Sequence, residues 1–271
     1  MIWGILIVLI VVCLGFLAWL FCIAPASPRG DFAEMKKYDY AHRGLHDIKK
    51  GIPENSYAAY QAAIDKNYAI EMDVRFSKDG KLVVFHDDTL DRTTEAKGPA
   101  ISKTRNELLE LHLQGTQQKI PVFEEFLEFV GGKAPLLIEL KNVPERKDLV
   151  RATLAALKNY KGEFALQSFQ PKYVYQMKKQ APQILRGQLA TIPLKEEIMP
   201  AVQKWALKNM PFHFLTKPDF ISFNIANLPF SKARRKNALL LGWTARTEEE
   251  YLRVKPMIDN VIFEYITPEK L

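Results

Sequence analysis

The sequence predicts an α/β protein of the (β/α)8 TIM-barrel type, preceded by a single N-terminal transmembrane helix. Two observations predict this arrangement. Short runs rich in β-branched and aromatic residues alternate with helical patterns throughout residues 29–271, and such alternation is typical of parallel βαβ units. Residues 1–24 contain no charged side chain, so all 38 basic and 31 acidic residues follow them. An open doubly wound sheet is the alternative fold.

Eight runs are predicted to be strands, which is the number that a (β/α)8 barrel needs. They are Tyr38–Gly44, Ala69–Phe76, Leu136–Lys141, Phe164–Phe169, Ile184–Leu189, Phe220–Phe223, Leu239–Thr244 and Val261–Glu264. Helices are expected between them at Ser56–Lys66, Phe123–Val130, Asp148–Asn159, Pro171–Lys179, Lys195–Leu207, Ser231–Lys236 and Glu248–Lys255. No clear linker divides this part, so we expect an anchor in residues 1–28 and one barrel domain in residues 29–271.

The alternation is interrupted after the second predicted strand. Only Ser77–Lys81 separate that strand from the apolar run Leu82–His86, and a parallel crossover needs a dozen residues or more. Asp79-Gly80 between two such runs is instead typical of a two-residue hairpin turn. We therefore expect an antiparallel hairpin at this point.

The turn fixes the register of the hairpin. If Lys78 pairs with Lys81, then Asp73 lies opposite His86 and the two side chains share one face. The chain that follows, about residues 87–119, is polar and irregular. It is expected to form a small insertion after the second strand.

The apolar run at residues 2–24 is long enough to cross a bilayer as one helix. A cleaved signal peptide is the alternative, but its apolar region would be ~7–15 residues long and would follow basic residues. Arg29, Lys36 and Lys37 follow the run, and no basic side chain precedes it. The positive-inside rule then favours a single-pass protein of the cell membrane with a cytoplasmic body. Membrane lipid is the expected partner of this helix.

The ends of the predicted strands supply candidate catalytic groups, because active-site residues of such barrels lie at the carboxyl ends of strands. His42 and Arg43 end the first strand. An imidazole can relay a proton near neutral pH, and a guanidinium matches phosphate oxygens. His86, placed beside Asp73 by the hairpin, would complete a general acid–base pair with His42.

Three acidic residues indicate a metal site. Glu71 and Asp73 are two apart on one strand, so both point the same way, and Glu139 and Lys141 repeat this spacing on the next strand. Buried carboxylates without partners are costly, and oxygen ligands suit Mg²⁺ or Ca²⁺. A divalent ion held by Glu71, Asp73 and Glu139 would offset the cost of burying their charges. Lys141 would then bind an anionic substrate. The alternative is that Lys141 forms a structural ion pair with Glu71 or Asp73 and no metal binds.

Other strand-end residues are candidates for substrate contacts. Gln167 could donate or accept a hydrogen bond, and Phe169 and Trp243 could wall a ligand pocket, although Trp243 suits core packing equally well. Asn55 could cap the first helix or contact substrate. No nucleic-acid-binding motif accompanies the net charge of +7, so nucleic acid is not an expected partner. Nothing in the sequence predicts an oligomeric state.

At this point several ordered motifs resemble the glycerophosphodiester phosphodiesterase family. They are Ala41-His42-Arg43-Gly44, Pro53-Glu54-Asn55-Ser56, Ile70-Glu71-Met72-Asp73-Val74, Lys78-Asp79-Gly80, Val83-Val84-Phe85-His86-Asp87 and Asp91-Arg92-Thr93-Thr94. The resemblance continues more thinly through Ile138-Glu139-Leu140-Lys141, Gln167-Ser168-Phe169 and Trp243-Thr244. It covers essentially the whole of residues 29–271 but not the N-terminal run.

The resemblance implies a (β/α)8 barrel that hydrolyses glycerophosphodiesters to sn-glycerol 3-phosphate and an alcohol. The residue roles it implies are an acid–base pair at His42 and His86, a divalent metal ion at Glu71, Asp73 and Glu139, phosphate contacts at Arg43 and Lys141, and further substrate contacts at Glu54, Asn55, Gln167, Phe169 and Trp243. The sequence departs from the family pattern late in the chain. Ala245-Arg246 stands where the family more often has Val-Asn, and Phe263-Glu264-Tyr265 replaces a Thr-Asp-x-Pro pattern.

Two other functions are compatible with the sequence. The N-terminal helix would hold the barrel near lipid, so a lysophospholipid is an alternative substrate. A membrane-tethered phospholipid-binding module on an inactive barrel is the alternative without catalysis.

Overall fold

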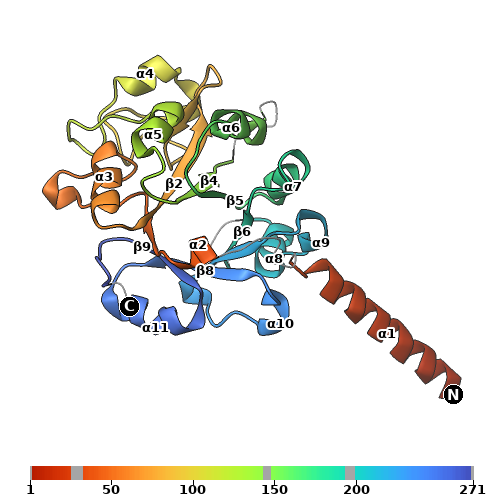
Figure 1. The fold of residues 1–271 in the computed structure, drawn as a ribbon. Coiled ribbons are helices and arrows are strands. Elements are labelled where there is room, and N and C mark those ends of the chain that lie inside the picture. The colour runs from red at the N-terminus through yellow and green to blue at the C-terminus, as the bar shows by residue number, and fades with distance from the viewer. Residues whose placement is uncertain (1, 26–32, 143–147, 193–198, 270–271) are drawn as a thin grey trace.

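The computed structural model describes residues 2–25, 33–142, 148–192 and 199–269. Within them, eight parallel strands close into a barrel with helices around it (Figure 1). The strands are β1 (Tyr40–His42), β2 (Ala69–Phe76), β4 (Leu136–Leu140), β5 (Phe164–Ser168), β6 (Arg186–Ala190), β7 (Phe220–Asn224), β8 (Leu239–Ala245) and β9 (Asn260–Phe263). Because β1 pairs in parallel with both β2 and β9, the sheet is closed. The predicted (β/α)8 barrel is confirmed, and the open doubly wound sheet is excluded.

Helices connect successive strands, as the alternation predicted. The connecting helices are α3 (Tyr57–Asp65), α5 (Phe123–Val130), α6 (Leu149–Leu157), α7 (Pro171–Gln180), α8 (Ala201–Asn209), α10 (Lys232–Arg235) and α11 (Glu248–Val254). Shorter helices are α2 (Ala33–Lys36), α4 (Arg105–Leu109) and α9 (His213–Thr216), with 3₁₀ turns at Ile48–Lys50, Ala100–Ser102, Ile225–Asn227 and Lys255–Met257. The predicted helix start at Lys195 and the predicted domain boundary at residues 28–29 lie outside the described residues. The domain limits therefore stay a prediction.

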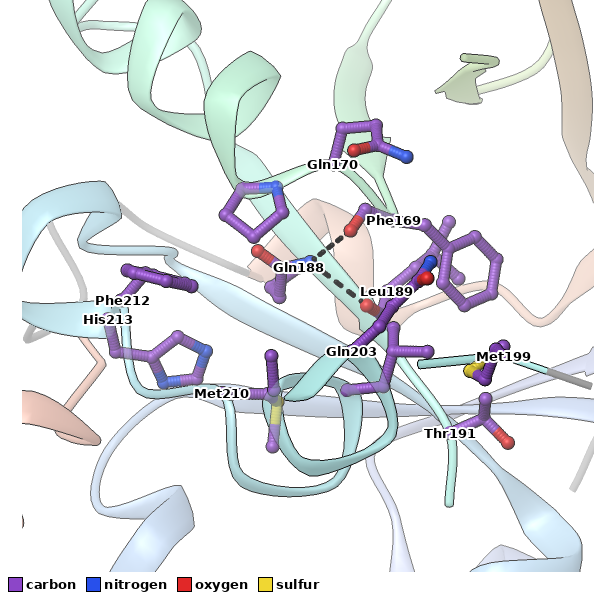
Figure 2. Close-up of a pocket in the computed structure, with 13 residues that line it drawn as sticks. Phe169, Gln170, Gln188, Leu189, Thr191, Met199, Gln203, Met210, Phe212 and His213 are labelled. Atoms are coloured by element: carbon purple, nitrogen blue, oxygen red, sulfur yellow. Dashed lines mark hydrogen bonds between the residues drawn. The ribbon is translucent and has the colours of Figure 1, made fainter. Parts of the chain in front are cut away.

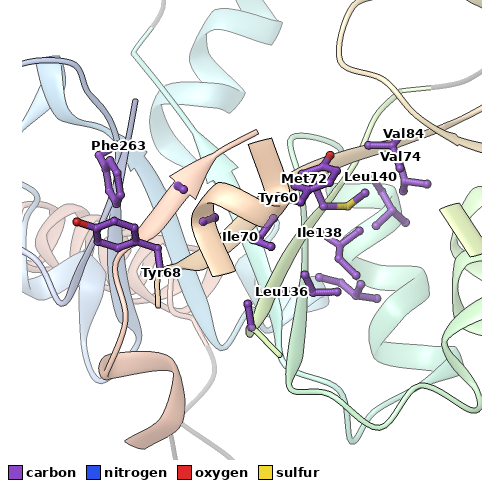
Figure 3. Close-up of a cluster of buried hydrophobic side chains, with 14 of the residues drawn as sticks. Tyr60, Tyr68, Ile70, Met72, Val74, Val84, Leu136, Ile138, Leu140 and Phe263 are labelled. Carbon is purple, nitrogen blue, oxygen red and sulfur yellow. The ribbon is translucent and has the colours of Figure 1, made fainter. Parts of the chain in front are cut away.

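The side chains of β2 show how the barrel separates its core from its site. Ile70, Met72 and Val74 point outward and pack under the helices, in the buried cluster that Figure 3 shows. Burying each such side chain stabilises the fold by about 1.5–3 kcal/mol. The alternate residues Glu71 and Asp73 point inward, because successive strand side chains face opposite sides.

The inside of the barrel has an apolar base and a polar top. A buried cluster fills the end at which the strands begin, and its members are Met35, Tyr40, Ala69, Leu137, Ala165, Phe220, Leu239, Leu241 and Ile262. Glu71, Asp73 and Glu139 follow on the same strands, closer to the carboxyl ends. These three carboxylates are therefore gathered near the carboxyl ends of the strands.

The predicted hairpin exists, but its predicted register is wrong by one residue. Strand β3 (Leu82–Val84) pairs antiparallel with β2 so that Val74 opposes Val84. The chain reverses through a three-residue loop, in which Gly80 has φ 76° and donates its N–H to Ser77 O. Such a loop is a common alternative to the two-residue turn, and it inserts one residue.

As a result, His86 is not paired with Asp73 within the ladder. The N–H of Phe85 donates to the carbonyl of Asp73 at 3.1 Å, and β3 ends two residues before His86. The Arg75 guanidinium donates to the carbonyl of His86 at 3.0 Å and holds the chain where it leaves the strand. His86 therefore reaches the top of the barrel from a loop.

The segment predicted as an insertion, residues 87–119, contains α4 and a 3₁₀ turn and is closed by two isolated bridges, Thr89 with Pro99 and His112 with Lys119. Together with β3 it encloses a small buried cluster of its own, made of Val83, Phe85, Leu90, Ala100, Leu108, Leu113 and Ile120. This cluster gives the loop that holds His86 a packed support.

The apolar N-terminal run forms the helix α1 (Ile2–Cys22), which projects away from the barrel beside α8 and α9 (Figure 1). It is long and apolar enough to cross a membrane, and none of the residues Ile5–Cys22 is buried. A core helix of a soluble protein would be largely buried, so α1 is not one.

Candidate active site

A pocket of about 110 Å³ opens at the carboxyl ends of the strands. Its lining residues are His42, Arg43, Glu71, His86, Glu139, Lys141, Gln167, Phe169, Leu189, Trp243, Thr244, Arg246 and Ile262. A more open polar groove of about 360 Å³ adjoins it and shares His86, Glu139, Lys141 and Phe169. Most of the predicted site residues therefore lie around one cavity.

Three carboxylates form a cluster at this pocket, in which Glu71 and Glu139 line the cavity and Asp73 lies beside them. Oxygen atoms of Glu71, Asp73 and Glu139 lie within 4.8 Å of one another, and all three residues are buried. The ladder between β2 and β4 explains the cluster, because it places Asp73 directly beside Glu139. Lys141 Nζ lies 3.0 Å from Asp73 and 2.8 Å from Glu139.

The charges of the cluster are only partly balanced. Burial, together with the Asp73 and Glu139 carboxylates, raises the pKa of Glu71 well above its usual range. Burial works in the same direction at Asp73, but Lys141 and the other cations nearby outweigh it and hold the pKa of Asp73 below its usual range. A divalent cation would remove the repulsion that Glu71 experiences. Three buried oxygen donors at this spacing fit Mg²⁺ or Ca²⁺.

His42 is held by a carboxylate that the sequence analysis did not assign to the site. Its Nδ1 donates to Glu264 Oε2 at 2.6 Å, and its Nε2 lies 3.9 Å from Glu71. Glu264 follows β9, next to β1 in the closed barrel. Burial and the Arg43 charge lower the pKa of His42 to about 4. With Nδ1 occupied, the Nε2 atom of His42 is the one that faces the carboxylate cluster.

Glu264 itself has three cationic or imidazole neighbours. Arg246 Nε donates to it at 2.5 Å, and His46 Nε2 lies 3.7 Å away. Burial opposes ionisation, but the hydrogen bond from His42 and the nearby His46 and Arg246 side chains hold the pKa of Glu264 well below its usual range. Arg246 and Glu264 both lie in the segments near the C-terminus where the sequence departs from the family pattern. The two side chains form an ion pair beside His42.

His86, which lines the same pocket, has a similar arrangement. Its Nδ1 donates to Asp87 Oδ1 at 2.6 Å. Arg92 Nε donates in turn to Asp87 Oδ2 at 2.7 Å. Burial raises the pKa of Asp87, but these two hydrogen bonds outweigh it and hold the pKa below its usual range. Both imidazoles are therefore oriented by ionised carboxylates.

Glu54 and Asn55 lie behind the pocket and do not line it. Glu54 accepts from Arg43 Nη1 at 2.6 Å and from both terminal nitrogens of Arg92 at 2.7 Å. Asn55 Nδ2 donates to Asp73 Oδ2 at 2.9 Å. The cap of α3 is Ser56, whose hydroxyl accepts from Ala59 N, so the capping role considered for Asn55 is wrong. These two residues support Arg43 and Asp73 from behind.

The three rim residues have distinct surroundings. Gln167 is buried and accepts a hydrogen bond from Ser222 Oγ at 2.6 Å. Phe169 packs edge-on against Trp243, with ring centroids 5.6 Å apart. The Trp243 indole donates to the Ser222 carbonyl at 3.1 Å. Phe169 and Trp243 together form an apolar wall of the pocket.

Comparison with known proteins identifies the family. The model of the glycerophosphoryl diester phosphodiesterase family matches residues 42–266, which include both histidines and the three carboxylates. The chain belongs to this family. A glycerophosphodiester phosphodiesterase of Caldanaerobacter subterraneus is 30% identical over 249 residues, which cover 88% of this chain and 97% of the relative. One from Bacillus subtilis is 26% identical and covers 92% of this chain and 90% of its own.

Solved structures of glycerophosphoryl diester phosphodiesterases share the fold. A phosphodiesterase from Oleispira antarctica, in complex with its product sn-glycerol-3-phosphate, superposes with a TM-score of 0.69 at 24% identity, covering 83% of this chain and 92% of its own. Family membership makes this chain a phosphoric diester hydrolase, and an inactive binding module is not supported.

The remaining histidines of this family member lie elsewhere. His46 is a neighbour of Glu264, His112 is exposed near Glu95, and His213 is buried at the start of α9. The ring of His213 is hydrogen-bonded at 2.9 Å to the carbonyl of Ile23, just beyond the end of α1.

Proposed function

We propose that this chain is a membrane-anchored, metal-dependent glycerophosphodiester phosphodiesterase that releases sn-glycerol 3-phosphate and an alcohol. The observation that supports it most strongly is the single pocket that gathers two carboxylate-held imidazoles, a three-carboxylate cluster and the cations Arg43 and Lys141. The family membership and the name of the relative at 30% identity agree with this substrate class.

Arg43 and Lys141 would bind the phosphate group. Glu54 holds the Arg43 guanidinium, and Asp73 and Glu139 hold the Lys141 ammonium, so neither cation has to be ordered by the substrate. Preorganised charges of this kind stabilise the negative charge that develops at phosphorus in the transition state.

Glu71, Asp73 and Glu139 would hold the divalent ion, Mg²⁺ or Ca²⁺. When bound, the ion supplies positive charge that offsets the non-bridging oxygens of the phosphate. Asn55 orients Asp73 by donating to its second oxygen. An outer partner of this kind usually affects metal affinity by ~10–100-fold.

His42 and His86 would act as the general acid–base pair. One imidazole removes the proton of the nucleophile, the neighbouring hydroxyl of the glycerol, and a cyclic phosphate forms as the bond to the alcohol breaks. The other imidazole gives its proton to the departing alcohol. Water then opens the cyclic phosphate with the roles reversed, which regenerates both imidazoles.

The helix α1 would anchor the barrel to the cell membrane. Its length, its lack of charge and its exposure support a span, and Lys36 and Lys37 beyond it favour a cytoplasmic body. A reporter fused at the C-terminus that is active only in the cytoplasm tests the orientation. If a reporter that is active only in the periplasm or outside the cell worked at the C-terminus instead, the barrel would lie on the other side of the membrane.

The direct test is hydrolysis of glycerophosphocholine by the full chain, with enzymatic detection of sn-glycerol 3-phosphate. We expect turnover that EDTA abolishes and that added Mg²⁺ or Ca²⁺ restores. Absence of glycerol phosphate in the presence of either ion would refute the substrate class. Turnover that persists in EDTA would refute the metal requirement but not the substrate class.

A further inference from the structure

The carboxyl end of α1 packs against α8 and α9. Trp19 of α1 contacts Trp205 of α8, with ring centroids 5.8 Å apart. Ile23, the residue after α1, is buried, and its carbonyl is hydrogen-bonded to the ring of His213 in α9 at 2.9 Å. If α1 crosses a bilayer, the surface of that bilayer therefore lies beside α8 and α9.

The helix α8 has apolar side chains on two sides. Ala206 and Leu207 line an apolar cavity of about 390 Å³ between β5, β6, α7 and α8, and Figure 2 shows Met210, just after α8, on its wall. Val202 and Trp205 are three apart and share a different face, where they are 74% and 48% exposed. A helix on the surface of a soluble protein normally has one apolar face, turned to the core. The second apolar side of α8 therefore indicates a partner outside the barrel.

The exposed apolar surface continues onto α9. Phe212 and Leu215, also three apart, are 42% and 43% exposed. Together with Val202 and Trp205 they form what we call the α8–α9 face. Single exposed apolar residues are ordinary on soluble proteins, but several on adjoining helices are typical of an interaction surface.

The helices around this face are basic. The ammonium group of Lys178 in α7 donates to the carbonyl of Leu215 at 2.6 Å, which places the end of α7 beside α9. The ammonium group of Lys217 lies 5.1 Å from the centre of the Phe21 ring, near the end of α1. The helices α7, α8 and α9, with the residue that ends α9, contain no Asp or Glu, and their lysines are Lys172, Lys178, Lys179, Lys204, Lys208 and Lys217. Such a charge is complementary to anionic lipid headgroups.

The helix α11 provides a contrast within the same molecule. It also exposes a large apolar side chain, since Leu252 is 62% exposed. Its first turn consists of Glu248, Glu249 and Glu250, and it lies away from α1 (Figure 1). Anionic lipid would repel this helix. Apolar exposure therefore coincides with basic charge on the side of the barrel that contacts α1.

We propose that the α8–α9 face rests on a bilayer that contains anionic lipid, with Val202 and Trp205 at the boundary between the headgroups and the hydrocarbon. Aromatic side chains are typical of this boundary, and Trp19 lies at the same level of α1. The inference rests on the membrane span in the proposed function and adds a second contact that a span alone does not require. This contact fixes the orientation of the barrel relative to the membrane.

The first test measures which positions contact lipid, with the full chain in nanodiscs of phosphatidylcholine and phosphatidylglycerol. Cys13→Ala and Cys22→Ala remove the two native thiols. An environment-sensitive fluorophore is then attached at one new cysteine, which is Ala201→Cys beside the α8–α9 face, Val11→Cys within α1 or Leu252→Cys on α11. We expect lipids that carry a nitroxide to quench the first two labels and not the third.

The three labels distinguish the docking from the span. Quenching at Val11 without quenching at Ala201 would overturn the docking and leave the span intact, whatever other partner the α8–α9 face has. Absence of quenching at both positions would overturn the span in the proposed function as well. Equal quenching at Ala201 and Leu252 would show that no particular face of the barrel meets the lipid, which also overturns the proposal.

The second test changes the face and the lipid while the Ala201 label reports docking. Val202→Glu places a charge at the boundary and should weaken docking by about tenfold or more, because an apolar contact is lost. Leu252→Glu, the matched control, should leave the quenching unchanged. Replacing phosphatidylglycerol with phosphatidylcholine should also lower the quenching. Full quenching in the Val202→Glu variant would overturn the docking, and equal quenching in both lipids would overturn the preference for anionic lipid.

Discussion

The two histidines of the candidate active site are held in the same way by different parts of the molecule. In each, Nδ1 donates to a carboxylate at 2.6 Å. His42 lies on the barrel, its side chain is 13% exposed, and its partner Glu264 is 222 residues away in the chain. His86 lies on the loop beyond the hairpin, its side chain is 30% exposed, and its partner Asp87 is the next residue. Barrel closure holds the first pair, and local chain geometry holds the second.

The difference indicates how tolerant each pair is to substitution. Glu264 is buried and supports His42 in a site that water reaches poorly. Asp87 is more accessible, so solvent can replace part of the hydrogen bonding that Asp87 provides to His86. A hydrogen bond to a charged group contributes more where solvent cannot replace it. We therefore expect a substitution of Glu264 to reduce activity more than a substitution of Asp87.

The largest effects should come from the imidazoles themselves. His42→Ala and His86→Ala should each lower glycerophosphocholine turnover by at least ~10²-fold, because each removes a proton-transfer group. Steady-state kinetics measures this, with His112→Ala as the control, since His112 is exposed and remote from the pocket. Near-normal turnover in either variant would remove that histidine from catalysis.

A substrate with p-nitrophenol as its leaving group separates the two roles. This alcohol departs without receiving a proton, and its release reports the first step alone. The variant that lacks the general acid should recover most of that activity, and the variant that lacks the general base should not. Equal recovery in both variants would contradict the division of roles.

Glu264→Gln should come next, with a loss of about 10–100-fold in kcat, the equivalent of one hydrogen bond to a charged group. The glutamine keeps the size of the side chain but removes the charge that orients His42. Thermal unfolding provides the control, since an intact fold with reduced kcat is expected. A loss confined to KM would instead point to a role in binding.

Asp87→Asn should reduce kcat by about tenfold, at the lower end of the same range, because the pair is partly exposed. The comparison between the two carboxylate variants is the informative measurement. An Asp87→Asn effect equal to or larger than that of Glu264→Gln would reverse the ranking of the two regions.

Arg92→Gln should have the smallest effect. The Arg92 side chain is 48% exposed and joins Asp87 to Glu54. Exposed ion pairs contribute less than ~1 kcal/mol, so the loss of activity should not exceed about fivefold. A loss as large as that of His86→Ala would mean that Arg92 contacts the substrate directly.

The gathering of most candidate residues at one pocket could be predicted, because it depends on residue type and on position within a strand. His42, Glu71, Asp73, Glu139 and Lys141 all follow from chemistry placed at the carboxyl ends of predicted strands. Glu264 satisfied the same rule at the end of the eighth predicted strand, and that signal was available. The residues around Glu264 depart from the family pattern, so the family motifs did not single it out.

The hairpin register shows what a local pattern leaves undetermined. The Asp79-Gly80 turn signal predicted the reversal correctly, but two- and three-residue loops both accommodate it. Only pairing against β2 selected the three-residue loop, which shifts the ladder by one position. His86 still enters the pocket because Arg75 and the packed loop beyond β3 redirect the chain.

The sequence by itself determined the (β/α)8 class, the apolar N-terminal helix and most of the side chains that gather in the candidate site, since these depend on periodicity, length and residue chemistry along short stretches. The tertiary structure alone decided which partners hold those side chains, because barrel closure brings residues from the two ends of the chain together, as with His42 and Glu264. It also decided the apolar cavity, whose walls come from separate strands and helices. Contacts between distant residues arise from packing, and no local pattern encodes them.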